Sequence, residues 1–183
     1  MRAPDFQPTL VGPAITIRPI SGGDWAELFA AASDPGIWEV DPEPDLYTEA
    51  DFRKFFDDAL ESKMAFVFVD HATGKLIGSS RYHGYDPDIG EIEIGWTFLV
   101  RSHWGGAANR EVKRLMLDHA FTFVHTVVFW VGEENWRSLR AMTKIGGIRR
   151  AGLHKRAVTA ERPYYIFEIT KRRYEGGGRA LLM

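Results

Sequence analysis

Short runs in which apolar residues alternate with polar ones, or stand together, predict the strands of this protein. The run over 126–131 is almost wholly apolar, which is typical of a strand buried on both faces of a sheet. A turn at His71-Ala72-Thr73-Gly74 joins two neighbouring runs into a hairpin. The predicted strands cover residues 15–20, 65–69, 76–82, 91–100, 126–131, 149–157 and 164–170.

Apolar residues that recur at every third or fourth position predict helices between these strands. Thr48-Glu49-Ala50-Asp51 is typical of a helix N-terminus, and Asn135 is a good N-cap residue. The predicted helices cover residues 25–32, 48–60, 108–124 and 135–145. This order of elements predicts an α+β fold, in which about four helices flank a mixed sheet of about seven strands.

The chain shows neither an internal repeat nor a second domain, so we expect one domain over residues 15–171. Residues 1–14 precede it as an N-terminal extension that is rich in proline. Residues 172–183 include Gly176-Gly177-Gly178 and are expected to form a flexible, frayed tail.

Composition narrows the classes of function. The 183 residues are 45% hydrophobic and 26% charged, which suits a globular domain with a sizeable core. The chain has no cysteine, which excludes disulfides, thiolate metal sites and a cysteine nucleophile, and we expect no metal. No apolar run approaches the ~18 residues of a membrane span, and the N-terminus lacks the apolar segment of a signal peptide. We therefore expect a cytoplasmic protein without a membrane partner.

Charge is unevenly distributed along the chain. Residues 39–61 carry nine acidic residues against two basic ones, and residues 149–173 carry eight basic residues against two acidic ones. This separation could draw a cationic substrate to one side and an anionic ligand to the other. The alternative is a solvated helix face and an ordinary basic segment. The basic segment has no nucleic-acid-binding motif and the net charge is −2, so no nucleic-acid partner is expected.

A turn of small residues stands between a predicted strand and a predicted helix. Gly105, Gly106, Ala107 and Ala108 have little or no side chain to keep a ligand away from the backbone. A helix N-terminus offers unpaired N–H groups and the positive end of a dipole, and both favour a phosphate group. The turn therefore predicts a phosphate or pyrophosphate site; the alternative is a turn without a ligand.

Three motifs within residues 15–170 resemble those of the Gcn5-related N-acetyltransferase (GNAT) superfamily, and above all the branch of the ribosomal-protein-alanine N-acetyltransferases. They are Glu93-Ile94-Gly95-Trp96-Thr97, the turn Trp104-Gly105-Gly106-Ala107-Ala108-Asn109-Arg110-Glu111, and Asn135-x-x-Ser138 followed by Lys144-x-Gly146. Two departures stand out. Ser102 replaces the long polar residue that begins the superfamily signature, and Met142 replaces a Tyr that many relatives use as a proton donor.

The resemblance implies a mostly antiparallel sheet with a V-shaped splay, and acetyl-CoA as the co-substrate. The acetyl group would pass directly to a primary amine in a ternary complex. The residues implied in binding acetyl-CoA are Phe98, Leu99, Val100, Arg101, Gly105, Gly106, Ala107, Ala108, Asn109, Asn135, Ser138 and Lys144.

Glu93 is the first candidate for the base that deprotonates the incoming amine. The structural alternative is a cross-strand pair with Arg81 or Lys75. Glu91 and His83 are further candidates for the base. Strict alternation puts the core face of the strand at Ile92, Ile94, Trp96, Phe98 and Val100, and the face bordering the acceptor at Glu91, Glu93, Gly95, Thr97 and Leu99.

Ser138 lies one turn into the helix that Asn135 caps, and its hydroxyl is the candidate acid that protonates the departing thiolate. The alternative for Ser138 is ordinary helix surface. Lys144 would lie at the rim of the acetyl-CoA site or interact with the helix C-terminus.

The acceptor would be reached past an acidic loop. The residues expected to bind it are Trp38, Tyr47, Glu91, His83 and Tyr165. The acceptor itself would be a protein or peptide N-terminus, or a small-molecule amine. The alternative function is a non-catalytic acyl-CoA-binding sensor or interaction domain. The protein is expected to be a monomer or a homodimer, the latter because edge strands near the C-terminus are exposed.

Overall fold

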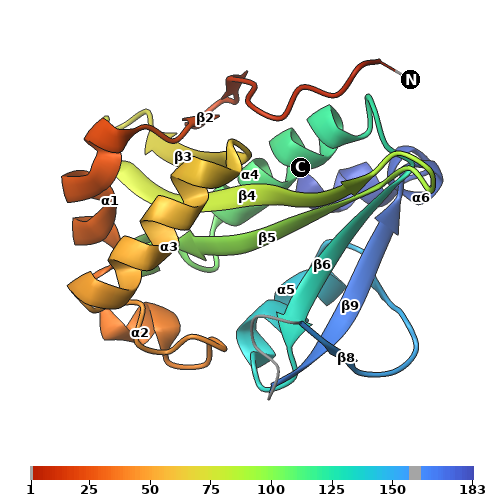
Figure 1. Cartoon of the computed structure of the whole chain (residues 1–183). Coiled ribbons are helices and arrows are strands. Elements are labelled where there is room, and N and C mark those ends of the chain that lie inside the picture. The colour runs from red at the N-terminus through yellow and green to blue at the C-terminus, as the bar shows by residue number, and fades with distance from the viewer. Residues whose placement is uncertain (1, 157–161) are drawn as a thin grey trace.

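The computed structural model describes residues 2–156 and 162–183 and has a single sheet flanked by helices (Figure 1). The strand order is β1-β2-β3-β4-β5-β6-β9-β7, with β8 paired to β9. The strands are β1 (Leu10–Val11), β2 (Ile15–Pro19), β3 (Ala65–Asp70), β4 (Leu76–Asp86), β5 (Glu91–Leu99), β6 (Thr126–Gly132), β7 (Ile148–Arg149), β8 (His154–Lys155) and β9 (Pro163–Thr170).

Within the described residues the sheet has nine strands, where about seven were predicted. Leu10 and Val11 of the N-terminal extension add β1 at one edge. At the other edge, a turn at Gly152, with φ of 85°, divides the run predicted over 149–157 into β7 and β8. Residue 157 of that prediction lies outside the described residues.

Two hydrophobic cores fill the two faces of the sheet. The α4 core packs α4, α5 and α6 against one face and contains Met116 and Ile145. The α3 core packs α1, α2 and α3 against the other face and contains Leu28 and Phe52. The helices are α1 (Trp25–Ala32), α2 (Pro35–Trp38), α3 (Glu49–Ser62), α4 (Ala107–Ala120), α5 (Trp136–Lys144) and α6 (Lys171–Glu175). No helix in the described part of the chain is long and apolar enough to cross a membrane.

The four predicted helices are present as α1, α3, α4 and α5, and the predicted caps of α3 and α5 are confirmed. The Thr48 hydroxyl accepts a hydrogen bond from the Asp51 N–H at the start of α3. The Asn135 side chain accepts one from the Ser138 N–H at the start of α5. Each bond satisfies an N–H that the helix leaves unpaired.

β5 and β6 pair in parallel, whereas the other neighbouring strands in the described sheet are antiparallel. The parallel pairing joins Glu91–Glu93 to Thr126–Val128. Farther along, β5 remains paired with β4 and β6 remains paired with β9, so the two strands diverge (Figure 1). We call this opening, between residues 94–99 of β5 and 129–132 of β6, the splay. It is the V shape that the family resemblance implied.

A β-bulge in β5 interrupts the alternation of its side chains. The register between β4 and β5 shifts at Trp96, whose φ of 52° is uncommon for a residue other than glycine. Beyond the bulge, Phe98 belongs to the α3 core and Leu99 to the α4 core. The predicted faces are therefore wrong over residues 96–99, because the extra residue reverses which side chains point to each face.

Residues 172–183, which were expected to form a frayed tail, are ordered together with Lys171. They form α6 and a 3-10 helix over Gly178–Leu182. Tyr174 and Leu182 are buried in the α4 core, and the Tyr174 hydroxyl donates a hydrogen bond of 2.8 Å to Asp118 on α4. Burial of these apolar groups offsets the entropy that a glycine-rich tail loses on ordering.

Candidate active site

The turn predicted to bind phosphate stands at the N-terminus of α4. Gly106 is its N-cap and provides no side-chain hydrogen bond to the first turn, and Gly105 has a φ of 69°. Both glycines and Ala107 are exposed, and a Cβ built on Gly105 would meet nothing within 4 Å. The first N–H groups of α4 can therefore be approached from solvent, which fits a pyrophosphate group.

Residues around this turn contact β5, α5 and α2. The Trp104 indole N–H donates a hydrogen bond of 2.8 Å to the Leu99 carbonyl at the end of β5. Arg137 of α5 stacks 4.6 Å above the Trp104 ring and donates to the Gly36 carbonyl in α2. Arg101 forms an ion pair of 2.5 Å with Asp34, the N-cap of α2. The starts of α2, α4 and α5 thus meet near the wide end of the splay.

The predicted residues of α5 lie at its two ends. Asn135 is 9% exposed, with its Oδ1 held by the Ser138 N–H at 3.1 Å and its Nδ2 3.5 Å from Asp41. Ser138 is half-buried in the first turn, whereas Lys144 is exposed in the last turn. Met142 is buried in the α4 core, so this side chain packs and takes no part in proton transfer.

Glu93 lies at the vertex of the splay, since it is the last residue of β5 paired with β6. Its carboxylate is buried and accepts hydrogen bonds from the Arg156 guanidinium and the Trp130 backbone N–H. Burial raises the pKa of Glu93 to about 7, although Arg156 and Arg81 oppose the shift. Its ion-pair partner is Arg156, whereas Arg81 or Lys75 was the predicted structural partner.

Three aromatic rings surround the Arg156 guanidinium. Its central carbon is 4.6 Å from the Trp96 ring, 4.8 Å from the Trp130 ring and 5.6 Å from the Tyr164 ring. The rings come from β5, β6 and β9, and we call these three residues the aromatic cage. The bulge at Trp96 turns its side chain to the same face of β5 as Glu93, which completes the cage.

Two of the predicted acceptor-binding residues lie close to Glu93 in the sheet, and of these His83 contacts the cage. His83 lies opposite Glu93 on β4, and its ring centroid is 5.0 Å from that of Trp96. Partial burial lowers the pKa of His83, and the charges of Arg156 and Arg81 add to the effect. Glu91 lies two residues before Glu93 on the same face, but Arg150 engages it at 2.5 Å.

The other three predicted acceptor-binding residues lie away from the cage. Trp38 is buried in the α3 core and its indole N–H donates to the Ala32 carbonyl. Tyr47 is exposed on the loop before α3. Tyr165 points to the opposite face of β9 from Tyr164, where Arg149 stacks on its ring at 4.5 Å.

Sequence reasoning did not identify a buried lysine on α4. Lys113 is 4% exposed, and its ammonium donates a hydrogen bond of 2.9 Å to the Thr97 hydroxyl on β5. The Phe129 ring on β6 is 5.2 Å away, so the amine lies between the two strands of the splay. Burial lowers the pKa of Lys113 to about 7. A signal was present, because Lys113 falls on the inward helical stripe that includes Ala120 and Met116.

Trp130 and Arg156 were also missed as site residues. In sequence, Trp130 is one apolar residue in a buried strand, and Arg156 is one of many basic residues near the C-terminus. Neither residue has a local motif, since the cage that unites them is assembled from strands far apart in the chain.

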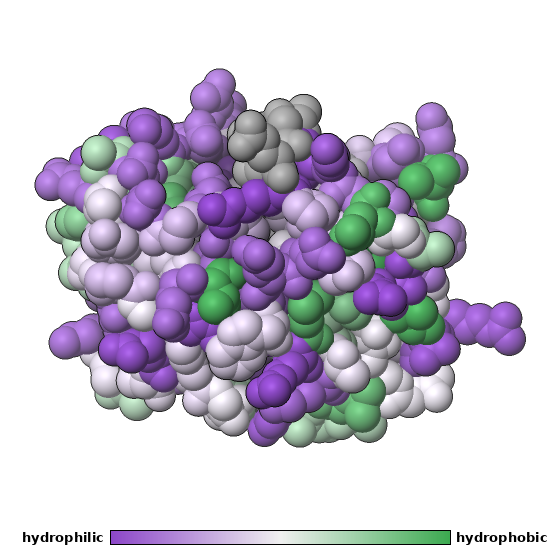
Figure 2. All heavy atoms as spheres, turned by 90° about the horizontal axis from the view of Figure 1, so that it is seen from below, coloured by the Kyte–Doolittle hydropathy of each residue, from purple (hydrophilic) through white to green (hydrophobic). Residues whose placement is uncertain are grey.

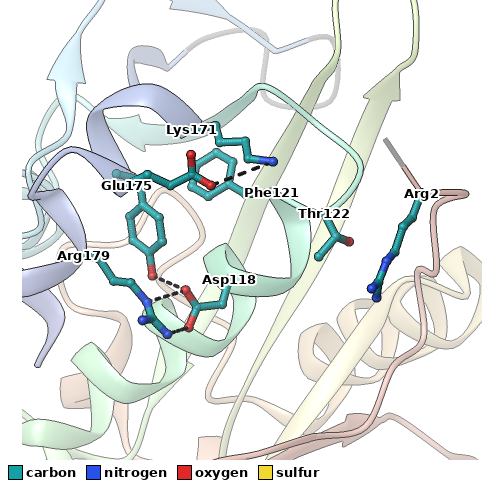
Figure 3. A pocket seen from close by; sticks show the side chains of 8 residues that line it. Arg2, Asp118, Phe121, Thr122, Lys171, Glu175 and Arg179 are labelled. Carbon is teal, nitrogen blue, oxygen red and sulfur yellow. Dashed lines mark hydrogen bonds and ion pairs between the residues drawn. The ribbon is translucent and has the colours of Figure 1, made fainter.

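A separate pocket of about 680 Å³ lies at the other end of α4 (Figure 3). Arg2, Tyr174 and Arg179 help to line it, and Arg179 and Tyr174 both contact Asp118. Asp118 stands twelve residues after Gly106, which is about 18 Å along the helix. This pocket therefore lies away from the α4 N-terminus.

The divergence of β5 and β6 beside an uncapped helix N-terminus defines a protein of the GNAT-fold class. The family model described as acetyltransferase (GNAT) domain matches residues 14–148, which is well over half of the chain. The chain therefore belongs to the GNAT acetyltransferase family, whose members use acetyl-CoA as the acetyl donor. A search of curated proteins found no match in sequence.

Solved structures agree in fold. A GCN5-related N-acetyltransferase from Brucella melitensis has a TM-score of 0.85 and 23% identity, covering 98% of this chain and 87% of its own. Spermidine N-acetyltransferase from Vibrio cholerae, in complex with CoA and spermine, has a TM-score of 0.69 and 16% identity, covering 90% and 99%. RimJ from Mycobacterium smegmatis, in complex with CoA-disulfide, has a TM-score of 0.67 and 20% identity, covering 96% and 92%. At these identities the likeness is one of fold.

Proposed function

We propose that this protein is an acetyl-CoA-dependent N-acetyltransferase that passes the acetyl group directly to a primary amine. The observation that carries the proposal is the buried carboxylate of Glu93 at the vertex of the splay. An amine attacks in its neutral form, and free primary amines titrate between about 8 and 10.4. A base with a pKa of about 7 next to the reacting centre suits that deprotonation at neutral pH.

In this proposal acetyl-CoA follows the splay. The pyrophosphate would bind the N–H groups from Gly105 to Ala108, with Asn109 beside them, and Phe98, Leu99 and Val100 would border the pantetheine arm. The exposed glycines and the divergence of the strands fit such a ligand. Asn135, Arg101 and Lys144 would lie around it, although Arg101 must then be shared with Asp34.

Acetyl-CoA supplies an acetyl group activated as a thioester, so that a nitrogen–carbon bond forms while the carbon–sulfur bond breaks. Glu93 takes the proton from the amine nitrogen. The Ser138 hydroxyl, which is half-buried at the start of α5, gives a proton to the departing thiolate and regains one from solvent. Ser138 takes this role in our proposal because Met142 has no proton to donate.

The acceptor in this proposal is a peptide or protein N-terminus or a small-molecule amine. Acidic residues favour a cation near the site: Asp41 contacts Asn135, and Glu43 interacts electrostatically with Arg156. The resemblance to the ribosomal-protein-alanine branch supports an N-terminal α-amine, and the fold shared with a spermidine acetyltransferase supports a polyamine.

Titration with acetyl-CoA by calorimetry, followed by turnover with a panel of primary amines, tests the proposal. We expect one-to-one binding that Gly105→Val weakens at least tenfold. Gly74→Val is the matched control, because Gly74 has a φ of 70° and equally open surroundings in the β3–β4 turn. Binding without turnover of any amine would favour the non-catalytic acyl-CoA-binding function. No binding at millimolar acetyl-CoA would contradict both functions.

A further inference from the structure

The aromatic cage and Glu93 together have the chemistry of a cation-binding site. Three ring faces lie within 6 Å of one guanidinium carbon, and a carboxylate contacts the same group. Attraction between a cation and a ring face strengthens when both are shielded from water. The Glu93 side chain is 6% exposed and that of Arg156 is 17% exposed, so this cation is largely desolvated.

The site lies at the splay, beside the path that acetyl-CoA follows in the proposed function. Trp96 and Trp130 belong to the two strands that form the splay, and Glu93 marks its vertex. The molecule seen from below in Figure 2 presents mainly hydrophilic residues, with its hydrophobic side chains in separate patches.

Arg156 conflicts with the role proposed for Glu93. A carboxylate that holds a guanidinium in a hydrogen-bonded ion pair is not available to take a proton from another group. Arg156 follows β8, a two-residue strand that pairs with β9 at the end of the sheet. Rotation about its own side-chain bonds can therefore remove the guanidinium without disrupting a long strand.

We propose that the aromatic cage and Glu93 bind the protonated amine of the acceptor, and that Arg156 occupies this site as an internal competitor until the acceptor displaces it. This inference rests on the proposed acetyl transfer to an amine. The acceptor arrives as an ammonium cation, replaces the guanidinium on the ring faces, and releases Glu93 to accept its proton. Charged primary amines are favoured over neutral isosteres of the same shape.

Binding of n-propylguanidine, which reproduces the Arg156 side chain, tests the cation site without any need for turnover. We expect Arg156→Ala to bind this probe at least tenfold more tightly than the unaltered protein by calorimetry. The uncharged n-propylurea should bind neither protein. Arg53→Ala is the matched control. Arg53 of α3 also stacks on a tryptophan, with its guanidinium carbon 3.2 Å from the Trp25 ring of α1, but it lies outside the cage. Trp130→Leu in the Arg156→Ala protein should abolish the gain in affinity for n-propylguanidine.

Kinetics with a primary amine test the competition. Arg156→Ala and Arg156→Gln should both lower KM for the amine, and n-propylguanidine should compete with the amine. Circular dichroism establishes whether each variant is folded. If Arg156→Ala does not fold, Arg156→Gln replaces it in the test, because glutamine keeps a hydrogen-bond donor near Glu93. Equal affinity of both proteins for n-propylguanidine, or equally tight binding of n-propylurea, would overturn the cation site. A raised KM would overturn the role of Arg156 as competitor.

The two proposals can fail separately. If no amine is acetylated but Arg156→Ala gains affinity for n-propylguanidine, the proposed function fails and the cation site remains. If amines are acetylated but that affinity is unchanged, the proposed function remains and the cation site is overturned.

Discussion

The carboxylate of Glu93 is buried and accepts hydrogen bonds from the Arg156 guanidinium and the Trp130 backbone N–H. These surroundings set its pKa. Burial raises its pKa to about 7, so the group loses its proton within the neutral range. A base must be deprotonated to act, and we therefore expect kcat/KM, which reports the free enzyme, to rise as pH increases through about 7.

Glu93→Gln should lower kcat by a factor of about 10² to 10⁴ and remove the rising limb of the pH–rate profile. Glutamine keeps the shape of the side chain but cannot accept a proton at these pH values. Glu168→Gln is the control, because Glu168 is a carboxylate that pairs with Arg150 on the same sheet. An unchanged pH–rate profile in Glu93→Gln would exclude Glu93 as the base.

Lys113 makes stability depend on pH. Its pKa is lowered from 10.5 to about 7 by burial, so the unfolded state binds more protons between these two values. Stability therefore rises with pH over this range, by at most about 1.4 kcal/mol per pH unit. Below about pH 7 both states are protonated and the dependence disappears.

Lys113→Met should remove this dependence and raise stability at pH 7, because the thioether fills similar space without a buried charge. Urea denaturation at pH 6.5, 8 and 9 measures the effect. Lys54→Met is the control, since the Lys54 side chain is 76% exposed. If the free energy of unfolding changed with pH in the same way in Lys113→Met and in the unaltered protein, Lys113 would not be the source of the pH dependence.

The N-caps of α5 and α3 separate the effect of a cap on stability from its effect on acetyl-CoA binding. Asn135 holds the first turn of α5 and stands among the residues proposed to contact acetyl-CoA, whereas Thr48 holds the first turn of α3 on the other face of the sheet. Loss of either cap leaves one helix N–H unpaired.

Asn135→Ala and Thr48→Ala should each lower the free energy of unfolding by about 1 kcal/mol. Asn135→Ala should also weaken acetyl-CoA binding, whereas Thr48→Ala should leave the calorimetric Kd unchanged. Equal Kd values for the two variants would remove Asn135 from the proposed binding residues and leave it as a helix cap.

Residues 178–182 contribute to the stability of the molecule through the α4 core. Leu182 is 3% exposed in the α4 core, and its neighbour Leu181 is 49% exposed. Arg179 anchors the same segment to Asp118 through an ion pair of 2.7 Å. The last residues therefore complete the core that supports α4, the helix that carries the proposed phosphate site.

Leu182→Ala should lower the free energy of unfolding by about 2 kcal/mol, the lower end of the range for buried leucines, because a short 3-10 helix can relax into the space. Leu181→Ala should change it by less than about 0.5 kcal/mol. Denaturant unfolding of both variants measures the difference. If neither variant differed from the unaltered protein, the segment would behave as the frayed tail that its composition indicates.

The sequence by itself determined the features that depend on neighbouring residues. The capping residues of α3 and α5, the glycine turn before α4 and the alternation up to Gly95 each follow from hydrogen bonding or sterics within a few residues. The order of these elements, with the motifs they carry, was sufficient to identify the fold and the family.

The tertiary structure alone decided the features that unite distant residues. The bulge at Trp96 depends on pairing with β4, and it reverses the faces of the strand beyond it. The cage needs β5, β6 and β9 side by side before Arg156 can enter it, and Lys113 becomes buried only when α4 packs across the splay. Burial of a charge and contact between separate strands are properties of the packed molecule, because no local run of residues contains them.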